Sequence, residues 1–230
     1  MPEFFSTSSF FYVTLTLVAF IFANTCQRQL KLPIFNPILI AAILVIAILN
    51  ILNIPNFAYQ AGCQALSFLL TPATICLAIG FYEQFQKLRH HIWAIFAGVL
   101  VGTVCSIGCI WLMSKIFCLD HALALSLLPK SVTTAIGVSL SDEIGGIAAV
   151  TTASIAITGI FGNITGPLMC RLFRFDSEVA QGVAFGTASH VIGTARAAEM
   201  SELAGAVSSL SLTIAGIATT LLLSFLAQYI

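Results

Sequence analysis

Long runs of apolar residues dominate the chain, and their lengths are typical of helices that cross a membrane. An α-helix needs about 20 consecutive, mostly apolar residues to cross the hydrocarbon core of a bilayer. Six runs predict such helices, at approximately 6–26, 35–53, 60–82, 92–117, 146–169 and 205–229. The pattern therefore predicts an all-α polytopic membrane protein with about six transmembrane helices.

Proline and glycine positions refine three of these runs. The second run opens at Asn36 and Pro37, and both residue types favour the start of a helix. Pro72 lies inside the third run and predicts a kink or a discontinuity there. Gly98 and Gly102 lie four residues apart in the fourth run, and this spacing predicts a face on which another helix packs closely.

Two further segments, 122–144 and 179–204, are apolar but rich in Ser, Thr, Gly or Ala, and both contain ionisable residues. Pro129 breaks the helical pattern of the first segment, and Lys130 follows it directly. Such segments are poor simple spans, so we predict that each is broken or re-entrant. In the alternative arrangement both broken helices cross the membrane, which changes the topology but not the site.

Basic residues predict which loops face the cytoplasm, because cytoplasmic loops carry the excess of Lys and Arg. They form three short loops, at Arg28 and Lys31, at Lys87 and Arg89, and at Arg171 and Arg174. All three loops lie inside if the N-terminus is outside, 122–144 re-enters from the outer face and 179–204 re-enters from the cytoplasm. Lys115 partly opposes this topology, because it then lies outside.

The two broken segments, each with the span that follows it, form two units in opposite orientations. The units start about 57 residues apart, at Leu128 and Phe185, and the stretches "LPKSVTTAIG" and "FGTASHVIGTA" resemble each other weakly. Inverted repeats with interrupted helices are typical of secondary transporters, whose substrate site lies near the membrane midplane. We therefore predict a transporter-like inverted repeat.

Composition supports the membrane assignment, because 59% of the residues are hydrophobic and only 8% are charged. The formal net charge is zero, which predicts no nucleic-acid partner. The seven cysteines have no metal-binding spacing, and neither a phosphate-binding loop nor a hydrolase motif occurs. We expect no enzyme activity, cofactor or metal. One membrane domain should cover 1–230, with four spans in 1–117 and the broken segments in 118–230.

Lys130 and its neighbours are the first candidate site. A charge at the bilayer centre costs about 2.5–3.5 kcal/mol on the milder insertion scale, so it is tolerated mainly where it lines a water-filled cavity. Ser131, Thr133 and Thr134 supply hydroxyl groups, and the helix that starts after Pro129 presents free N–H groups and the positive end of its dipole. This combination suits an anionic ligand such as a carboxylate. In the alternative reading, Lys130 reaches the membrane interface and Pro129 only kinks a helix.

The second segment holds a second polar cluster. Its members are Thr187, Ser189, His190, Gly193, Thr194 and Arg196. His190 is able to exchange a proton near neutral pH, and Arg196 is able to clamp a carboxylate with two hydrogen bonds. Gly193 allows close approach of backbones, as does Gly186. The alternatives are a hydrogen-bonded packing role for His190 and an ion pair between Arg196 and Glu199.

Four polar residues in other parts of the chain are weaker candidates. They either line a path through the membrane or only satisfy helix breaks, and they are Asn36, Thr71, Asn163 and Thr165. Glu199 and Glu202 are expected to be ion-pair or rim residues.

Four stretches of the chain resemble motifs of the LrgB/CidB family. "LPKSVTTAIGVSLSDEIGGIAA" and "GTASHVIGTARAAE" resemble its two signature stretches, and "FNPILIAA" and "TPATICLAIGFYEQ" are similar to its earlier motifs. The motif residues are Pro129, Lys130, Ser131, Thr133, Thr134, Gly145, Gly146, Ser189, His190, Gly193, Thr194 and Arg196. The chain departs from the family at Ala135 and Ala148, where members often have proline.

The resemblance implies a multi-pass protein of the bacterial inner membrane, often encoded beside a small holin-like partner of the LrgA/CidA type. It implies two alternative functions. One is an antiholin-like regulator of murein hydrolase activity and autolysis, without a transport cycle. The other is a carrier for small monocarboxylates of the pyruvate, lactate or glycolate/glycerate type, because the membrane portion of a plastidial glycolate/glycerate translocator is similar to both partners fused. Intramembrane Lys130, His190 and Arg196 favour the carrier. By analogy with alternating-access transporters, we expect a homodimer in the lipid bilayer.

Overall fold

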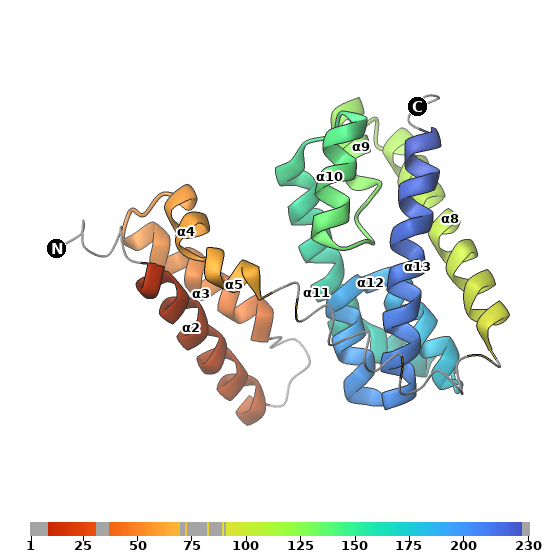
Figure 1. Ribbon diagram of the computed structural model, residues 1–230, viewed down its shortest axis with the longest axis horizontal. Coiled ribbons are helices and arrows are strands. Elements are labelled where there is room, and N and C mark those ends of the chain that lie inside the picture. The colour runs from red at the N-terminus through yellow and green to blue at the C-terminus, as the bar shows by residue number, and fades with distance from the viewer. Residues whose placement is uncertain are drawn as a thin grey trace. The chain divides into compact units, whose positions relative to one another are not determined.

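The structure is a computed structural model that describes residues 9–30, 37–69 and 91–226 and the single positions 72, 82 and 89. Within these residues it contains helices and connecting turns but no strands. The chain divides into two compact units, Met1–Cys76 and Leu77–Ile230. Figure 1 labels the helices of the two units.

The described residues of the first unit form four helices, α2 (Ser9–Leu30), α3 (Pro37–Ile51), α4 (Asn56–Gly62) and α5 (Gln64–Phe68). Helix α2 packs against α3 around a core that includes Tyr12, Ala19, Val45 and Leu49. Helix α3 has 15 residues and is about 22 Å long at 1.5 Å per residue, so it is shorter than the predicted span 35–53. The described part of the predicted span 60–82 contains the end of α4 and all of α5, while residues 70, 71 and 73–81, on both sides of the predicted kink at Pro72, lie outside the described residues.

The second unit contains six helices among the described residues. They are α8 (Ile92–Ile116), α9 (His121–Leu127), α10 (Thr134–Ile144), α11 (Ala148–Leu172), α12 (Glu178–Met200) and α13 (Glu202–Leu226). Helices α8, α11 and α13 are long and apolar enough to cross a membrane, as is Ser9–Gln27 in the first unit. The predicted spans 6–26, 92–117, 146–169 and 205–229 are therefore confirmed as helices, with shifts of a few residues at their ends.

Burial in the second unit is typical of a membrane protein. In α8 the buried positions form one stripe spaced three or four residues apart, and they are Ile95, Val99, Thr103, Ile107, Ile110 and Ser114. Large apolar side chains outside this stripe are exposed, and Trp93 is 83% exposed. The interior is instead rich in Ser and Thr, because small residues let membrane helices approach closely and hydroxyls bond across them.

Helices α9 and α10 form a hairpin, called hairpin one, whose turn is 128–133. The Thr151 hydroxyl near the start of α11 donates to the Ser126 carbonyl of α9 at 2.9 Å and lies 2.7 Å from the Ser141 hydroxyl of α10. Lys130, at the turn, instead lies beside Thr158 in the middle of α11. The chain therefore enters along α11, breaks at Pro129 as predicted, and returns to the end where it began.

Helix α12 forms a second hairpin, called hairpin two, because His190 has a φ of 43° and a ψ of −138° inside the helical run. Before this turn, Gly182 and Gly186 pack against successively later residues of α13. After it, the order is reversed: the Thr194 hydroxyl lies 2.9 Å from that of Ser208, and Ala198 packs on Gly205. The segment predicted over 179–204 thus also reverses direction, and α13 begins at Glu202 rather than 205.

The two hairpins enter the second unit from opposite ends (Figure 1). Glycines of α11 approach hairpin two in reverse order, because Gly159 faces His190, Gly162 faces Ser189 and Gly166 faces Phe185. Helix α11 is therefore antiparallel to the first arm of hairpin two, and that arm is parallel to α13. This places the turns of both hairpins in the middle of the unit.

The predicted close-packing face of α8 is confirmed. A side chain at Gly98 would lie 3.2 Å from Val183, and one at Gly102 would lie 3.5 Å from Thr187. Both neighbours belong to the first arm of hairpin two. Glycine at these two positions lets α8 hold this arm against α13.

Candidate functional site

A cavity of about 310 Å³ lies where the two hairpin turns approach each other. Lys130 comes from hairpin one and Ser189 from hairpin two, and α11 contributes Thr158 and Thr165. Most of the remaining lining is apolar, including Phe161 and Phe185. The structure thus brings together two of the predicted site residues, Lys130 and Ser189, and one predicted pathway residue, Thr165.

Lys130 is the one charged side chain among the described residues that line this cavity, called the Lys130 cavity below. Its backbone N–H donates to the Leu127 carbonyl at 3.2 Å, which fixes the turn after α9. Pro129 is fully buried and has no N–H to continue the helix, so the chain must turn here. The ammonium group is therefore held half-buried at a helix break.

The other predicted residues of hairpin one lie beside this cavity rather than in its lining. The Ser131 hydroxyl is 3.0 Å from the Ser106 hydroxyl of α8. Thr133 is the N-cap residue of α10, but its side chain makes no capping hydrogen bond. Thr134 is exposed in the first turn of α10. Of these three residues, only Ser131 bonds another helix through its side chain, and this bond ties hairpin one to α8.

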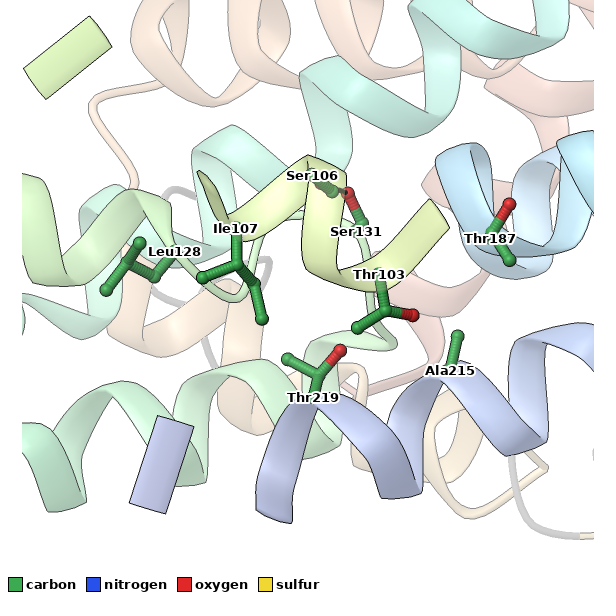
Figure 2. Close-up of a pocket in the computed structure, with 8 residues that line it drawn as sticks. All are labelled: Thr103, Ser106, Ile107, Leu128, Ser131, Thr187, Ala215 and Thr219. Carbon is green, nitrogen blue, oxygen red and sulfur yellow. Dashed lines mark hydrogen bonds between the residues drawn. The ribbon is translucent and has the colours of Figure 1, made fainter. Parts of the chain in front are cut away.

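A much smaller cavity, about 10 Å³, is lined by residues of α8, α13 and both hairpins (Figure 2). Its hydroxyl groups come from α8, hairpin one, hairpin two and α13, and they belong to Thr103, Ser106, Ser131, Thr187 and Thr219. This volume matches a single water molecule. The Thr103 hydroxyl is buried and has no hydrogen-bond partner among the described residues, so a bound water here would satisfy it. Thr103, Ser106 and Thr219 are not among the site residues predicted from the sequence. Of the three, Thr103 carries a signal in the sequence, because it is a polar residue on the apolar stripe of α8.

His190 is buried at the turn of hairpin two. Its Nε2 lies 2.9 Å from the Ile155 carbonyl of α11, and because a carbonyl only accepts, Nε2 carries the proton. Gly159 leaves the space that the imidazole occupies. The surroundings of His190 are thus those of a hydrogen-bonded packing residue, which was the alternative role given for it above. Gly193 and Thr194 also hold the turn, because Thr194 donates to the His190 carbonyl at 2.9 Å and Gly193 packs on Ser189.

Arg196 lies outside the Lys130 cavity. Its guanidinium forms an ion pair with Glu199 at 2.5 Å, as the alternative reading expected. It also lines a separate cavity of about 510 Å³ together with Arg171, Arg174 and Gln181. The reversal of the chain at His190 carries Arg196 back toward the end of the unit where α12 begins.

Two of the four weaker pathway candidates, Asn163 and Thr165, lie among the described residues. The Asn163 side chain donates to the Ile192 carbonyl at 3.2 Å, so it satisfies a backbone group beside the turn of hairpin two. The Thr165 hydroxyl donates to Phe161 within α11. Asn36 and Thr71 lie outside the described residues. Among the described residues, no group of three or more His, Cys, Asp or Glu side chains is arranged to hold a metal ion.

The fold and the site define a multi-pass helical membrane protein in which the turns of two opposed hairpins meet at a cavity lined by a half-buried lysine. The chain belongs to the LrgB-like family, whose family model matches residues 16–229. It is 32% identical over 222 residues to an antiholin-like protein LrgB of Bacillus mycoides, covering 96% of each chain. It is 34% identical over 214 residues to a holin-like protein CidB of Staphylococcus aureus, covering 93% of each chain.

No solved structure matches the chain. The family relatives and the long apolar helices together identify a multi-pass protein of the bacterial inner membrane. The resemblance based on the signature stretches is confirmed.

Proposed function

We propose that the protein is a secondary transporter, or the carrier subunit of one, for small monocarboxylates of the pyruvate, lactate or glycolate/glycerate type. The observation that carries this proposal is Lys130, a cation at a helix break in a cavity beside the turn of the opposite hairpin. Charged residues inside membrane proteins are costly and typically mark substrate or ion pathways.

The chemistry of the Lys130 cavity fits a small monoanion. One ammonium group neutralises one carboxylate, whereas a second carboxylate would be desolvated without a partner. The hydroxyls of Ser189, Thr158 and Thr165 offer hydrogen bonds to a hydroxy or keto group. A volume of about 310 Å³ accommodates a carboxylate of a few carbon atoms together with water.

The opposed hairpins support a transport cycle. Each hairpin is followed by one long helix, hairpin one by α11 and hairpin two by α13. These two hairpin–helix pairs run in opposite directions. We interpret the two pairs as an inverted repeat, in which rocking of one pair against the other exposes the site alternately to each side of the membrane. The proposed carrier works in the lipid bilayer as a homodimer, acts with a small LrgA/CidA-type membrane partner, and has no catalytic or nucleic-acid-binding role.

An antiholin-like regulator of murein hydrolase activity is the second candidate function. The names of the relatives, antiholin-like protein LrgB and holin-like protein CidB, favour it. A regulator without a transport cycle gives no reason for a lysine at the meeting point of two hairpins, so we rank it second.

Uptake of radiolabelled pyruvate, lactate and glycolate by proteoliposomes tests the proposal, with and without a small LrgA/CidA-type protein. Lys130→Gln should reduce uptake at least about tenfold, because the loss of one buried ion pair exceeds 1.4 kcal/mol. Lys115→Gln is the matched control, because Lys115 is an exposed cation at the end of α8. Wild-type vesicles that take up none of the three carboxylates would favour the regulator. Unchanged uptake in Lys130→Gln would refute the site.

A further inference from the structure

The cavity beside Arg196 contains a concentration of positive charge that the proposed function leaves unused. Arg171, Arg174 and Arg196 line it, and Asp176 is the one acidic residue among the described residues of its lining. Glu199 pairs with Arg196 but does not belong to the lining. Three guanidinium groups face one carboxylate in this lining, so the lining carries a net positive charge that favours an anion.

Arg196 has a specific unsatisfied donor. Its Nε is buried and has no hydrogen-bond partner among the described residues, although NH1 bonds Glu199. An unpaired buried donor costs about 1–3 kcal/mol, and more when the group is charged. The Arg196 side chain is 37% exposed and lines the cavity, so an oxyanion there would meet a guanidinium group, whose geometry matches carboxylates and phosphates.

The end of α11 fixes the other two arginines. The Phe175 N–H donates to the Cys170 carbonyl at 2.8 Å, and Arg174 adopts a positive φ of 53°. This is the usual way to end a helix, but glycine or asparagine normally takes the left-handed position because a larger side chain is strained there. Gln181 holds the same turn by donating to the Phe175 carbonyl at 2.6 Å.

The arginine cavity adjoins the Lys130 cavity. Cys170 and Phe175 line both of them. Phe175 is 40% exposed and its ring stacks on that of Phe173, so it is not locked in a core. It forms a wall that the arginine cavity and the Lys130 cavity share.

We propose that Arg171, Arg174 and Arg196 form a second anion site, an entrance vestibule that captures the carboxylate at the end of the protein where α12 begins and passes it beyond Phe175 to Lys130. The positive charge of the three loops predicts that this end faces the cytoplasm. This inference rests on the proposed function. The same chemistry would recognise the phosphate of an anionic lipid headgroup, because basic pockets at this depth also bind lipids.

Sided transport kinetics distinguish a vestibule from a transport site. In proteoliposomes of known orientation, Arg196→Gln and the double variant Arg171→Gln/Arg174→Gln should raise the KM for pyruvate about tenfold when pyruvate starts on the arginine side. KM from the other side should be unchanged, and kcat should fall less than KM rises. Lys130→Gln should instead lose turnover from both sides. Lys115→Gln should behave as wild type. An unchanged KM from both sides in the arginine variants would overturn the vestibule.

Lipid dependence tests the second source of the anion. The same KM values should be obtained in vesicles with and without phosphatidylglycerol. The opposite result has three parts: phosphatidylglycerol raises the melting temperature of wild type, the arginine variants lose this increase, and the pyruvate KM is the same in wild type and in the variants. This result would show that the site binds lipid, and it would refute carboxylate capture.

A binding measurement separates failure of this inference from failure of the proposed function. Pyruvate titrated into the purified protein in detergent should raise its melting temperature, and the arginine variants should require about tenfold more pyruvate for the same rise. This outcome supports the anion site even if wild-type vesicles transport no carboxylate. A wild-type response that the arginine variants keep would overturn it.

Discussion

The His190 imidazole occupies space that α11 leaves free at Gly159. A Cβ at that position would lie 2.5 Å from Cε1 and 2.7 Å from Nε2 of the ring. The absence of a side chain thus allows the hydrogen bond from Nε2–H to the Ile155 carbonyl. The imidazole of His190 ties hairpin two to α11 through this bond, and the unusual backbone angles of His190 reverse α12.

Gly159→Ala should therefore destabilise the protein by about 1–3 kcal/mol, as expected for adding a methyl group to a packed interior. Gly108→Ala is the matched control, because a Cβ at Gly108 has no neighbour within 4 Å, and it should change stability by less than about 1 kcal/mol. Melting temperatures in detergent measure both. Equal stability of the two variants would mean that the space at Gly159 is not required by His190.

At the scale of elements, hydroxyl groups hold hairpin one against α11. The Ser126 hydroxyl accepts from the Ile147 N–H at 2.7 Å, and Thr151 bonds both arms of the hairpin. These contacts link residues 10 to 25 positions apart. They keep the turn at Lys130 beside the middle of α11.

Thr151→Val removes this link while it keeps the shape of the side chain. The expected loss is about 1–2 kcal/mol, because a hydrogen bond between membrane helices contributes about 0.6 kcal/mol on average and up to 1.7, and Thr151 makes two. Thr152→Val is the control, because the exposed Thr152 hydroxyl bonds only Ala148 within its own helix. Unfolding in detergent should separate the two variants, and hydrogen exchange should locate the loss in hairpin one. A loss of stability in Thr152→Val as large as in Thr151→Val would contradict this account.

The sequence predicted the turn of hairpin one more directly than the turn of hairpin two and the side chains around it. Pro129 is a direct signal for a break, because proline removes a backbone donor. Hairpin two turns at His190, which is a non-glycine residue at positive φ and carries no such signal. The prediction that Arg196 belongs with the polar residues of the turn followed from closeness in sequence. In the structure, six residues beyond a reversal bring the side chain into a different cavity.

At the scale of the whole molecule, the hydropathy pattern identified the long helices because a bilayer requires apolar stretches of a set length. The small cavity was not predicted, because its hydroxyls come from α8, both hairpins and α13, and no local pattern joins them. The charge distribution predicted re-entrant segments, and the chain directions in the second unit agree with that prediction. Which end of the unit faces the cytoplasm stays a prediction from the positive loops.

Cysteine labelling tests both the hairpins and their sidedness. In a background without native cysteines, His121→Cys and Glu143→Cys mark the two ends of hairpin one, and Glu178→Cys and Met200→Cys mark those of hairpin two. All four positions are exposed. Because each hairpin returns to its starting end, an impermeant maleimide should label both members of a pair from the same side. The first pair should react in intact cells, and the second only after permeabilisation. Labelling of one pair from both sides would show that the segment crosses the membrane, and two swapped pairs would invert the orientation while leaving the hairpins intact.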